Sequence, residues 1–352
     1  YIRGRENAVF EPLLLNNLGV LYHLMGSYEQ AISTLGESLR QAEQSGDDRT
    51  RALALASLGD LYADLDLTEA ALNLYVQAFA ISEQITFRFL LFYLNLARTR
   101  LARLAGDRAG ARMLLALAKQ VAHQSDASSL PGEYWLEAGQ LAQAEKRFPE
   151  AIGNYNQALS IFIKGDQHVE IGQTRFYLAL SHHLSGDKDL AQENLEKSLA
   201  QISSLENWHL LAKIARKEKQ FWQDMRVDAV PAELLNQLLA SIADFEKRIP
   251  SLRRHLRQEF ENLAVFPPEL AIHTLGESKV VLNSKILSGS DWQVKKARDL
   301  FFYLLAHPDG KTKETLGEIF WPDHSPAQVK LQFKNTIYRL RRALFYEMIT
   351  PY

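Results

Sequence analysis

The chain has 352 residues, of which 47% are hydrophobic and 23% charged, so it is long enough for two or three domains and can bury a sizeable core. It contains no cysteine, which excludes a disulfide framework and thiolate metal sites and fits a reducing compartment. No apolar run reaches the roughly 18 residues that a membrane span needs, and the first residues lack a signal-peptide pattern. We therefore expect a cytoplasmic protein without membrane contact. Tyr1 in place of Met indicates a piece of a longer protein.

Charge is distributed unevenly along the chain. Residues 270–352 carry 12 Lys or Arg against 8 Asp or Glu, whereas the whole chain has a net charge of −2. A basic end on an acidic body is typical of a small nucleic-acid-binding module attached to a larger regulatory body, because phosphate groups attract positive charge. Ordinary fluctuation in composition is the alternative.

A period of 40 residues runs through residues 1–200. Pairs such as Leu18-Gly19 and Leu58-Gly59 recur at this spacing and define a grid of equivalent positions. An alanine lies 12 residues after the second member of each grid pair. Small residues at fixed places allow two helices to approach closely, while larger apolar residues fill the layer between neighbours. Each of five units is therefore predicted to be a helix pair. The five alanines are Ala31, Ala71, Ala111, Ala151 and Ala191.

Turn residues agree with this assignment. Gly26, Gly106 and Gly186 occupy one grid position between the two helices of a unit, where glycine adopts a positive φ most easily. Asp66 and Lys146 stand there in the other two units.

The segments "LGVLYHLMGSYEQAISTLGESL" and "AGQLAQAEKRFPEAIGNYNQAL" resemble the tetratricopeptide repeat, and the resemblance covers residues 10–200. The third unit is degenerate, and the units exceed the usual length of about 34 residues. Longer units of this kind resemble the sensor superhelices of large bacterial activators such as the maltose-regulon activator. The resemblance implies a mostly α-helical solenoid over residues 1–200 with a concave binding surface.

The tetratricopeptide pattern also implies which residues of each first helix line the concave surface. Arg100 and Arg103, with Gln140 and Gln143 in the next unit, would offer donors to a peptide carboxylate, a phosphate or a sugar. Solvated polar side chains on a helix face are the alternative. The Lys and Asn set with which some tetratricopeptide domains hold a C-terminal carboxylate is not reproduced, since only Asn16 matches it. The inner positions are Asn16, Val20, His23, Ala56, Asp60, Ala63, Leu96, Arg100, Arg103, Leu136, Gln140, Gln143, Phe176, Leu180 and His183, of which the eight polar or charged ones are the candidate ligand- or partner-binding residues.

The grid fails beyond residue 200, where its next alanine position is Pro231. Helical patterns continue at 207–225 and 231–249, so residues 201–265 are predicted to be a helical cap and linker. The stretch "AVFPPEL" contains Pro267 and Pro268, which stop any helix. A second domain is predicted at 269–352.

Short apolar stretches follow the prolines. "LAIHTLG", "SKVVLN" and a candidate third stretch, "KILSGS", have the pattern of strands. Two helices are predicted next, one through "DWQVKKARDLFFYLLAHP" and one through "KTKETLGEIFWP". The second is expected to pack Leu316, Ile319 and Phe320.

The stretch "KLQFKNTIYRLRRAL" predicts a third, amphipathic helix. Its apolar stripe consists of Val329, Phe333, Ile337, Leu340 and Leu344, which leaves a cationic face outward. Arg makes bidentate hydrogen bonds with guanine or phosphate, Asn makes them with adenine, and Lys binds phosphate. A solvated helix surface is the alternative. The candidate DNA-binding residues are Gln328, Lys330, Leu331, Lys334, Asn335, Tyr338, Arg339, Arg341 and Arg342.

These last residues resemble the response-regulator-type winged helix of antibiotic regulatory proteins and related bacterial activators. The matching motifs are Thr274-Leu275-Gly276, Trp292, Lys296-Ala297-Arg298, His307-Pro308, Trp321-Pro322 and Arg339 to Leu344. The resemblance implies a small α+β domain whose last helix enters the DNA major groove. Two departures are that the domain follows the repeats and that the wing is truncated to "FYEMITPY".

The chain has no Gly-rich phosphate loop, zinc-protease motif or acidic calcium loop, and adjacent His182-His183 point about 100° apart on a helix. We expect no enzyme activity, metal or cofactor. The leading hypothesis is a transcriptional regulator whose solenoid binds an inducer, peptide or protein and whose winged helix binds double-stranded DNA. Self-association is a further expected interaction. The alternative is a protein-interaction scaffold that does not bind DNA.

Overall fold

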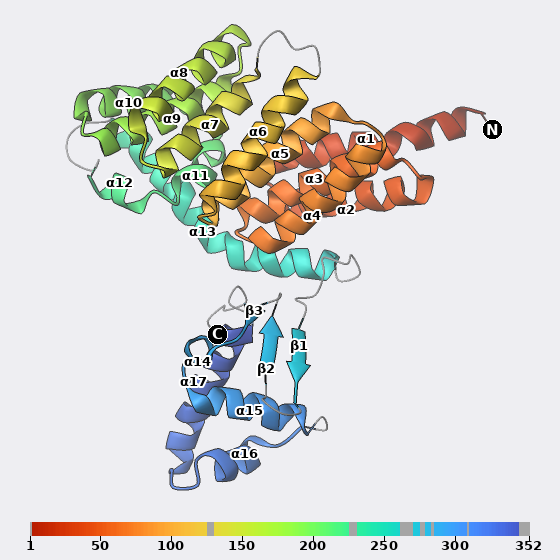
Figure 1. Cartoon of the computed structure of the whole chain (residues 1–352), viewed down its shortest axis with the longest axis vertical. Coiled ribbons are helices and arrows are strands. Elements are labelled where there is room, and N and C mark those ends of the chain that lie inside the picture. The colour runs from red at the N-terminus through yellow and green to blue at the C-terminus, as the bar shows by residue number, and fades with distance from the viewer. Residues whose placement is uncertain are drawn as a thin grey trace. The chain divides into compact units, whose positions relative to one another are not determined.

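The computed structural model describes residues 2–124, 130–224, 231–260, 270–274, 279–282, 285–307 and 310–344. The chain divides into two compact units, Tyr1–Val265 and Phe266–Tyr352 (Figure 1). The predicted linker 264–270 falls almost wholly outside the described residues. The motif residues Leu275, Gly276 and Pro308 and the truncated wing after Leu344 also lie outside them.

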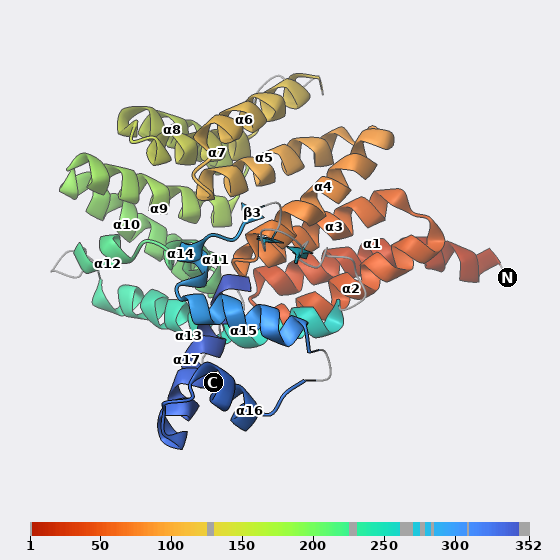
Figure 2. The same ribbon diagram turned by 60° about the horizontal axis from the view of Figure 1, so that its bottom comes forward.

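The first unit begins with five helix pairs that follow one another as a solenoid (Figure 2). In each pair an inner helix precedes an outer helix, and each of the first four outer helices also packs against the inner helix of the next pair. The inner helices are α1 (Ile2–Leu24), α3 (Asp48–Asp64), α5 (Arg88–Leu104), α7 (Gly132–Ala144) and α9 (His168–Ser185). The outer helices are α2 (Tyr28–Ser45), α4 (Thr68–Gln84), α6 (Arg108–His123), α8 (Phe148–Lys164) and α10 (Lys188–Ser203).

The 40-residue grid corresponds to the layer between paired helices. All five grid alanines are fully buried, as the close approach of two helices requires. Gly59 packs against the ring of Tyr75 and Gly139 against the ring of Tyr155, so each glycine provides space for an aromatic of its partner helix.

The turns within each repeat and those between repeats contain a residue with a left-handed backbone conformation at a fixed position. Gly26, Gly106 and Gly186 have φ of +76°, +82° and +89°, and Asp66 and Lys146 adopt +59° and +62° at the same position. A second series, which the glycine pattern did not predict, lies 20 residues further on between repeats. It consists of Gly46, Thr86, Asp166 and Glu206.

Three further helices return from the fifth repeat to the first two. They are α11 (His209–Ala215), α12 (Lys219–Asp224) and α13 (Ala232–Glu259). One half of α13 places Leu235, Leu238 and Ile242 in a core with α9 to α12, and the other half reaches the core of the first three repeats. Helix α13 therefore joins segments that are distant in the sequence. The residues at its other end that enter the core of the first repeats are Phe245, Ile249, Leu252, Leu256 and Phe260.

The second unit contains a small antiparallel sheet in the order β1-β2-β3, formed by β1 (Leu270–His273), β2 (Lys279–Leu282) and β3 (Lys285–Ile286). Val280 and Trp292 form a core with Ala297, Ala343 and Leu344. The helices are α14 (Gly289–Trp292), α15 (Lys295–Leu305), α16 (Lys313–Phe320) and α17 (Pro326–Leu344).

Two predictions for this unit need correction. The helix expected across 291–308 is broken, because Gln293 adopts φ +61° and Val294 is extended, which separates α14 from α15. Ile319 was expected to pack against the core, but it is 47% exposed because the buried face of α16 is formed by Leu316 and Gly317. The close approach of Gly317 to Val329 brings α16 against α17.

Gly139→Ala is expected to lower the free energy of unfolding by about 1–3 kcal/mol, because the added methyl group overlaps the buried ring of Tyr155. Gly153→Ala is the matched control, since this glycine is exposed in α8 with open space beside it, and its helix propensity should add about 0.5–1 kcal/mol. Urea unfolding of both variants measures the difference. Equal stabilities would contradict the packing assigned to the repeat layer.

Candidate functional site

Polar side chains tie each inner helix of the solenoid to the next. Ser57 Oγ donates to Asn16 Oδ1 at 3.0 Å between α1 and α3. The Tyr93 hydroxyl donates to Asp60 between α3 and α5, and Tyr75 donates to the other oxygen of Asp60 at 2.7 Å. We call this series of contacts the inner polar ladder.

The ladder continues through the fourth and fifth inner helices. Arg103 Nε donates to Glu137 Oε1 at 2.9 Å, and a second nitrogen of Arg103 donates to Gln140. Ser181 Oγ donates to Gln143 Oε1 at 2.7 Å, which joins α7 to α9. Burial acts to lower the pKa of Arg103, but Glu137, Tyr177 and Tyr155 together outweigh this effect and the pKa is raised.

Most of the polar residues predicted to bind a ligand are thus engaged in contacts with other side chains of the solenoid. Asn16 and Gln140 are buried, and His23 is buried against Asp64. Arg100 differs, because 39% of its side chain is exposed and its contact with Glu137 Oε2 is 3.9 Å long. Its guanidinium retains donors for an added anionic group.

The last inner helix is covered by the returning helices. Phe176 and Leu180, predicted to line the concave surface, are buried, and Phe176 stacks on Trp222 of α12 with ring centroids 5.6 Å apart. His183 lies against Phe221 with its ring centroid 5.3 Å away. Phe176, Leu180 and His183 are therefore part of the packing of α9 against α12 and are not open concave surface.

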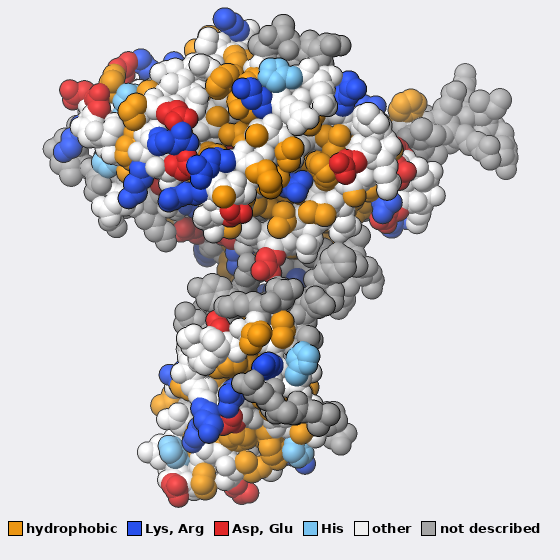
Figure 3. Space-filling model, viewed as in Figure 1, with side chains coloured by type: hydrophobic (Ala, Val, Ile, Leu, Met, Phe, Trp, Pro, Cys, Tyr) orange, Lys and Arg blue, Asp and Glu red, His pale blue; other side chains and the backbone are white. Residues whose placement is uncertain are grey.

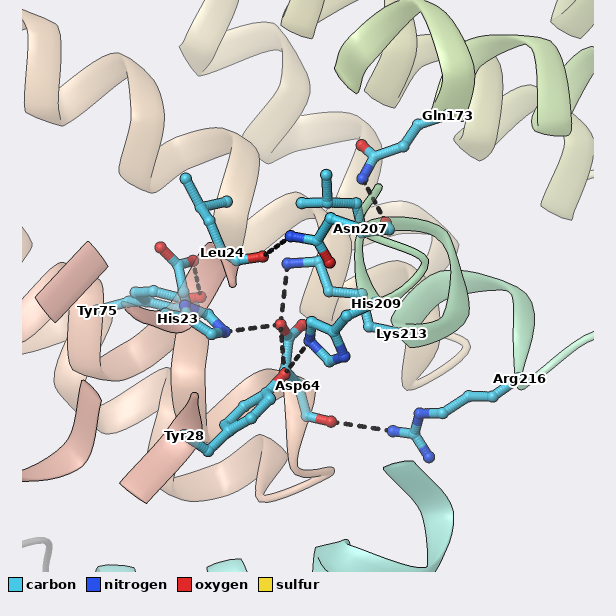
Figure 4. A network of polar contacts seen from close by, with 12 residues as sticks. His23, Leu24, Tyr28, Asp64, Tyr75, Gln173, Asn207, His209, Lys213 and Arg216 are labelled. Carbon is cyan, nitrogen blue, oxygen red and sulfur yellow. Dashed lines mark hydrogen bonds and ion pairs between the residues drawn. The ribbon is translucent and has the colours of Figure 1, made fainter. Parts of the chain in front are cut away.

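A partly buried polar cluster links α1, α2 and α3 to α11 (Figure 4). Asp64 Oδ2 lies 2.9 Å from His23 Nε2 and accepts from Lys213 Nζ at 3.0 Å. The Tyr28 hydroxyl lies 3.4 Å from the same oxygen and 3.1 Å from His209 Nε2. Burial opposes ionisation of Asp64, yet Lys213 and His23 hold its pKa well below the ordinary value. The cluster is a charged connection between residues 149 positions apart in the sequence.

Further contacts surround this cluster. Asn207 donates to the Leu24 carbonyl at 3.0 Å, and Arg216 donates to the Asp64 carbonyl at 3.0 Å. Arg253 of α13 donates to the Leu65 carbonyl at 2.6 Å. None of these three donors was predicted from the sequence, because their partners are more than 150 positions away and a repeat period does not report so distant a contact.

The exposed face of α17 carries most of the predicted DNA-binding residues. Lys330, Leu331, Lys334, Asn335 and Tyr338 are all exposed. Figure 3 shows Lys and Arg side chains among hydrophobic ones on the visible face of this unit.

The other four predicted DNA-binding residues differ. Gln328 accepts from the Ser325 amide at 2.9 Å at the start of α17, and Arg339 is half-buried. The side chains of Arg341 and Arg342 lie outside the described part of the chain. Among the described side chains, the exposed residues of the predicted reading face are Gln328, Lys330, Leu331, Lys334, Asn335 and Tyr338.

Arg339 lines a hollow of about 380 Å³ beside α17. Trp321 forms one wall of this hollow, and the ammonium of Lys296 lies 5.6 Å from the centre of its indole ring. Lys296 also donates to the Phe320 carbonyl at 2.7 Å. The hollow is cationic with one aromatic wall. Its lining residues are Val294, Lys295, Lys296, Trp321, His324, Gln332, Thr336 and Arg339.

Membrane spans and metal clusters are two other features that bear on function. Among the residues that the structure describes, no helix is long and apolar enough to cross a membrane. The same part of the chain contains no group of three or more His, Asp or Glu side chains arranged to hold a metal ion.

Comparisons with known proteins agree with the repeat geometry. Residues 11–84 and 132–202 match the family model of the tetratricopeptide repeat, and the unmatched interval contains the degenerate third helix pair. A Rap protein complexed with competence and sporulation factor superposes with a TM-score of 0.53 at 18% identity, over 72% of this chain and 77% of that one. The apo form of RapI gives 0.50 at 11% identity, over 70% and 85% of the two chains. A search of curated proteins gave no match. The solenoid has the fold of a tetratricopeptide-repeat superhelix.

Arg103→Ala is expected to lower the free energy of unfolding by about 3 kcal/mol, because it leaves the buried Glu137 carboxylate without its closest cation. Arg100→Ala is the matched control, and its effect should stay within about 0.5 kcal/mol because its contact is long and partly exposed. Urea denaturation separates the two variants. A decrease in stability in Arg100→Ala equal to that in Arg103→Ala would contradict the distinction between them.

Stability should also fall on mild acidification because of His209. Burial, followed by the charge of Lys213, lowers the pKa of His209 from its ordinary 6.5 to about 4. Between these values the unfolded chain binds a proton that the folded chain does not, so stability is full above about pH 6.5 and decreases by about 3 kcal/mol as the pH approaches 4. His209→Gln should flatten this dependence in urea unfolding measured at a series of pH values. Exposed His168→Gln should keep it, and an unchanged slope in His209→Gln would contradict the assignment.

Proposed function

We propose that this chain is the sensor and DNA-reading part of a transcriptional regulator. In this proposal the superhelix binds a peptide, protein segment or small inducer, and the second unit is a winged helix whose α17 enters the major groove of DNA. The chain performs no chemistry of its own.

The inner surface of the superhelix supports the sensing role. Arg100 is its partly exposed cation and lies beside the ladder contacts of Glu137 and Asp60. Tetratricopeptide superhelices present such surfaces to partners, and the Rap protein of similar fold was solved in complex with competence and sporulation factor. A ligand with a carboxylate or phosphate would accept hydrogen bonds from the guanidinium of Arg100.

The element order of the second unit supports the DNA-reading role. Three antiparallel strands precede the packed helices and leave the last helix, α17, with an apolar side inward and a cationic side exposed. The single observation that carries the proposal is this exposed face, where Lys330 and Lys334 lie one turn apart with Asn335 and Tyr338. Lysines at this spacing suit phosphate, and an exposed Asn suits adenine.

A scaffold without DNA binding is the second candidate function. It is favoured by the half-buried position of Arg339 and by the capping role of Gln328, since both reduce the number of side chains that can reach bases. Under this alternative α17 would carry its lysines only for solubility.

Lys330→Ala combined with Lys334→Ala tests the choice. The double variant should bind duplex DNA more weakly at every sequence, and the slope of log affinity against log salt should fall by about two, because each lysine neutralises one phosphate. Fluorescence anisotropy with random and promoter-derived duplexes across a salt series measures both quantities.

Lys164→Ala with Lys188→Ala, on exposed positions of the solenoid, removes the same charge and is expected to leave the slope unchanged. Equal weakening in the two double variants would indicate nonspecific attraction to the whole chain. Absence of any salt-dependent binding by the unmodified chain would favour the scaffold.

A further inference from the structure

The hollow beside α17 lies where the start of α15 meets the last helix. We call it the α17 hollow. Its volume is about 380 Å³, whereas one water molecule occupies roughly 30 Å³ in the liquid. It therefore has room for a small organic molecule. Val294, Lys295 and Lys296 line it from the start of α15, Trp321 and His324 from the segment after α16, and Gln332, Thr336 and Arg339 from α17.

The lining of the α17 hollow is positively charged. It contains the cations Lys295, Lys296 and Arg339 and no Asp or Glu, although the whole chain has a net charge of −2. Within the described part of the chain, the side chains of Lys295 and Arg339 make no ion pair or hydrogen bond. Lys296 gives one hydrogen bond to the Phe320 carbonyl, and an ammonium group has three donors. The hollow thus holds donors and positive charge that the protein itself leaves available.

A second hollow, on the solenoid, shows the contrast. It has a volume of about 290 Å³, and its lining includes Arg112, Lys119 and Arg147 but also Glu150. Arg147 pairs with both Glu150 and Glu145, and Arg112 lies 3.4 Å from Glu145. Carboxylates of the protein therefore neutralise most of the cations in that hollow, which does not happen in the α17 hollow.

Helix α15 begins at the α17 hollow without a side-chain cap. Its N-cap residue, Val294, makes no side-chain hydrogen bond to the first amides, and the first turn contains no acidic residue. The first amide groups of a helix and the positive end of its dipole favour an anion. An anion in the hollow would lie at this end of α15, where Ser, Thr, Asp or Asn would otherwise act as the cap.

Thr336 is an independent observation that points to a hydrogen-bond acceptor. Its side chain lines the hollow from α17, yet the residue is only 4% exposed. No described residue forms a hydrogen bond with its hydroxyl. Buried polar groups are ordinarily hydrogen-bonded, because an unsatisfied one loses its contact with water without compensation. An acceptor inside the hollow would satisfy this hydroxyl.

We propose that the α17 hollow binds a small organic phosphate, with the phosphate between Arg339, Lys295 and the Thr336 hydroxyl. A phosphate monoester presents three oxygens and a charge of about −1.5 to −2, which suits several cations and a hydroxyl better than the two oxygens and single charge of a carboxylate. The organic group occupies the rest of the hollow, against Val294 and Trp321.

The phosphate backbone of DNA is the other source of such a group. A backbone phosphate carries a single charge, and a duplex meets exposed side chains such as Lys330 and Lys334 before it can reach the buried Thr336. These observations favour the small molecule. The site does not depend on DNA recognition by α17, so the two can be tested separately.

Calorimetric titration of the full chain with phenyl phosphate tests the site. Phenyl phosphate should bind, and benzoate, which has the same ring with a carboxylate, should bind more weakly. Thr336→Val keeps the side-chain shape and removes the hydroxyl, and Lys295→Ala removes an exposed cation. Each should weaken the binding of phenyl phosphate by about tenfold, because each removes a hydrogen bond to a charged group.

Lys119→Ala is the matched control, since it removes a cation from the hollow on the solenoid. It should leave the affinity for phenyl phosphate unchanged. All three variants should keep the circular dichroism and the thermal unfolding of the unmodified chain.

Fluorescence anisotropy with duplex DNA distinguishes the two sources of phosphate. Thr336→Val should leave the affinity for the duplex unchanged. A loss of duplex affinity equal to the loss for phenyl phosphate would assign the hollow to the DNA backbone and overturn the proposal. A chain that binds phenyl phosphate but no duplex would contradict DNA recognition and still support this site.

Four results of the calorimetric titration would also overturn the proposal. They are no binding of phenyl phosphate, benzoate binding of equal strength, an unchanged affinity in both Thr336→Val and Lys295→Ala, and an equal weakening in Lys119→Ala. The last result would show that the anion follows the general charge of the chain.

Discussion

The apolar stripe of α13 is the contact on which the first unit depends. A repeat solenoid is held by neighbour contacts alone, so its ends are independent of each other. Here one half of α13 packs with α9 to α12 while the other half joins the core of the first repeats. The Asp64 cluster adds a charged connection beside it, where Lys213 and His23 meet one carboxylate. The curvature of the superhelix is therefore set by a long-range contact and not by the repeats alone.

This fixed curvature determines what the inner surface offers. The ladder contacts join successive inner helices, so Asn16, Asp60, Arg103 and Gln143 hold the surface in shape. Helix α12 packs against α9, which confines the open surface to the middle repeats. Arg100 remains partly exposed because its partner Glu137 is already engaged by Arg103 at the shorter distance. Most of the predicted binding residues thus serve the architecture of the solenoid, and Arg100 keeps a partly exposed guanidinium.

Helix pairs could be predicted from the sequence because small residues at a fixed period report a local packing requirement. The same period predicted the turns, including Asp66 and Lys146, which adopt the positive φ that glycine has elsewhere. It did not predict the return of α13, since an apolar stripe shows that a face is buried but not what buries it. Nor did it predict which inner polar residues are hydrogen-bonded to each other. A sequence period gives the position of a residue along a helix, but it does not show which neighbouring side chain that residue contacts. One signal was available: Ser57 and Glu137, both ladder partners, stand immediately before the repeated pairs Leu58-Gly59 and Ala138-Gly139.

The proposed DNA-reading role places a further requirement on the assembly. A single reading helix makes few contacts, and specific sites usually consist of two half-sites read by a symmetric dimer. The exposed cations of α17 in one copy would therefore give weak binding. If two copies of α17 stood in one assembly, the second binding event would be intramolecular and strengthened by its effective concentration.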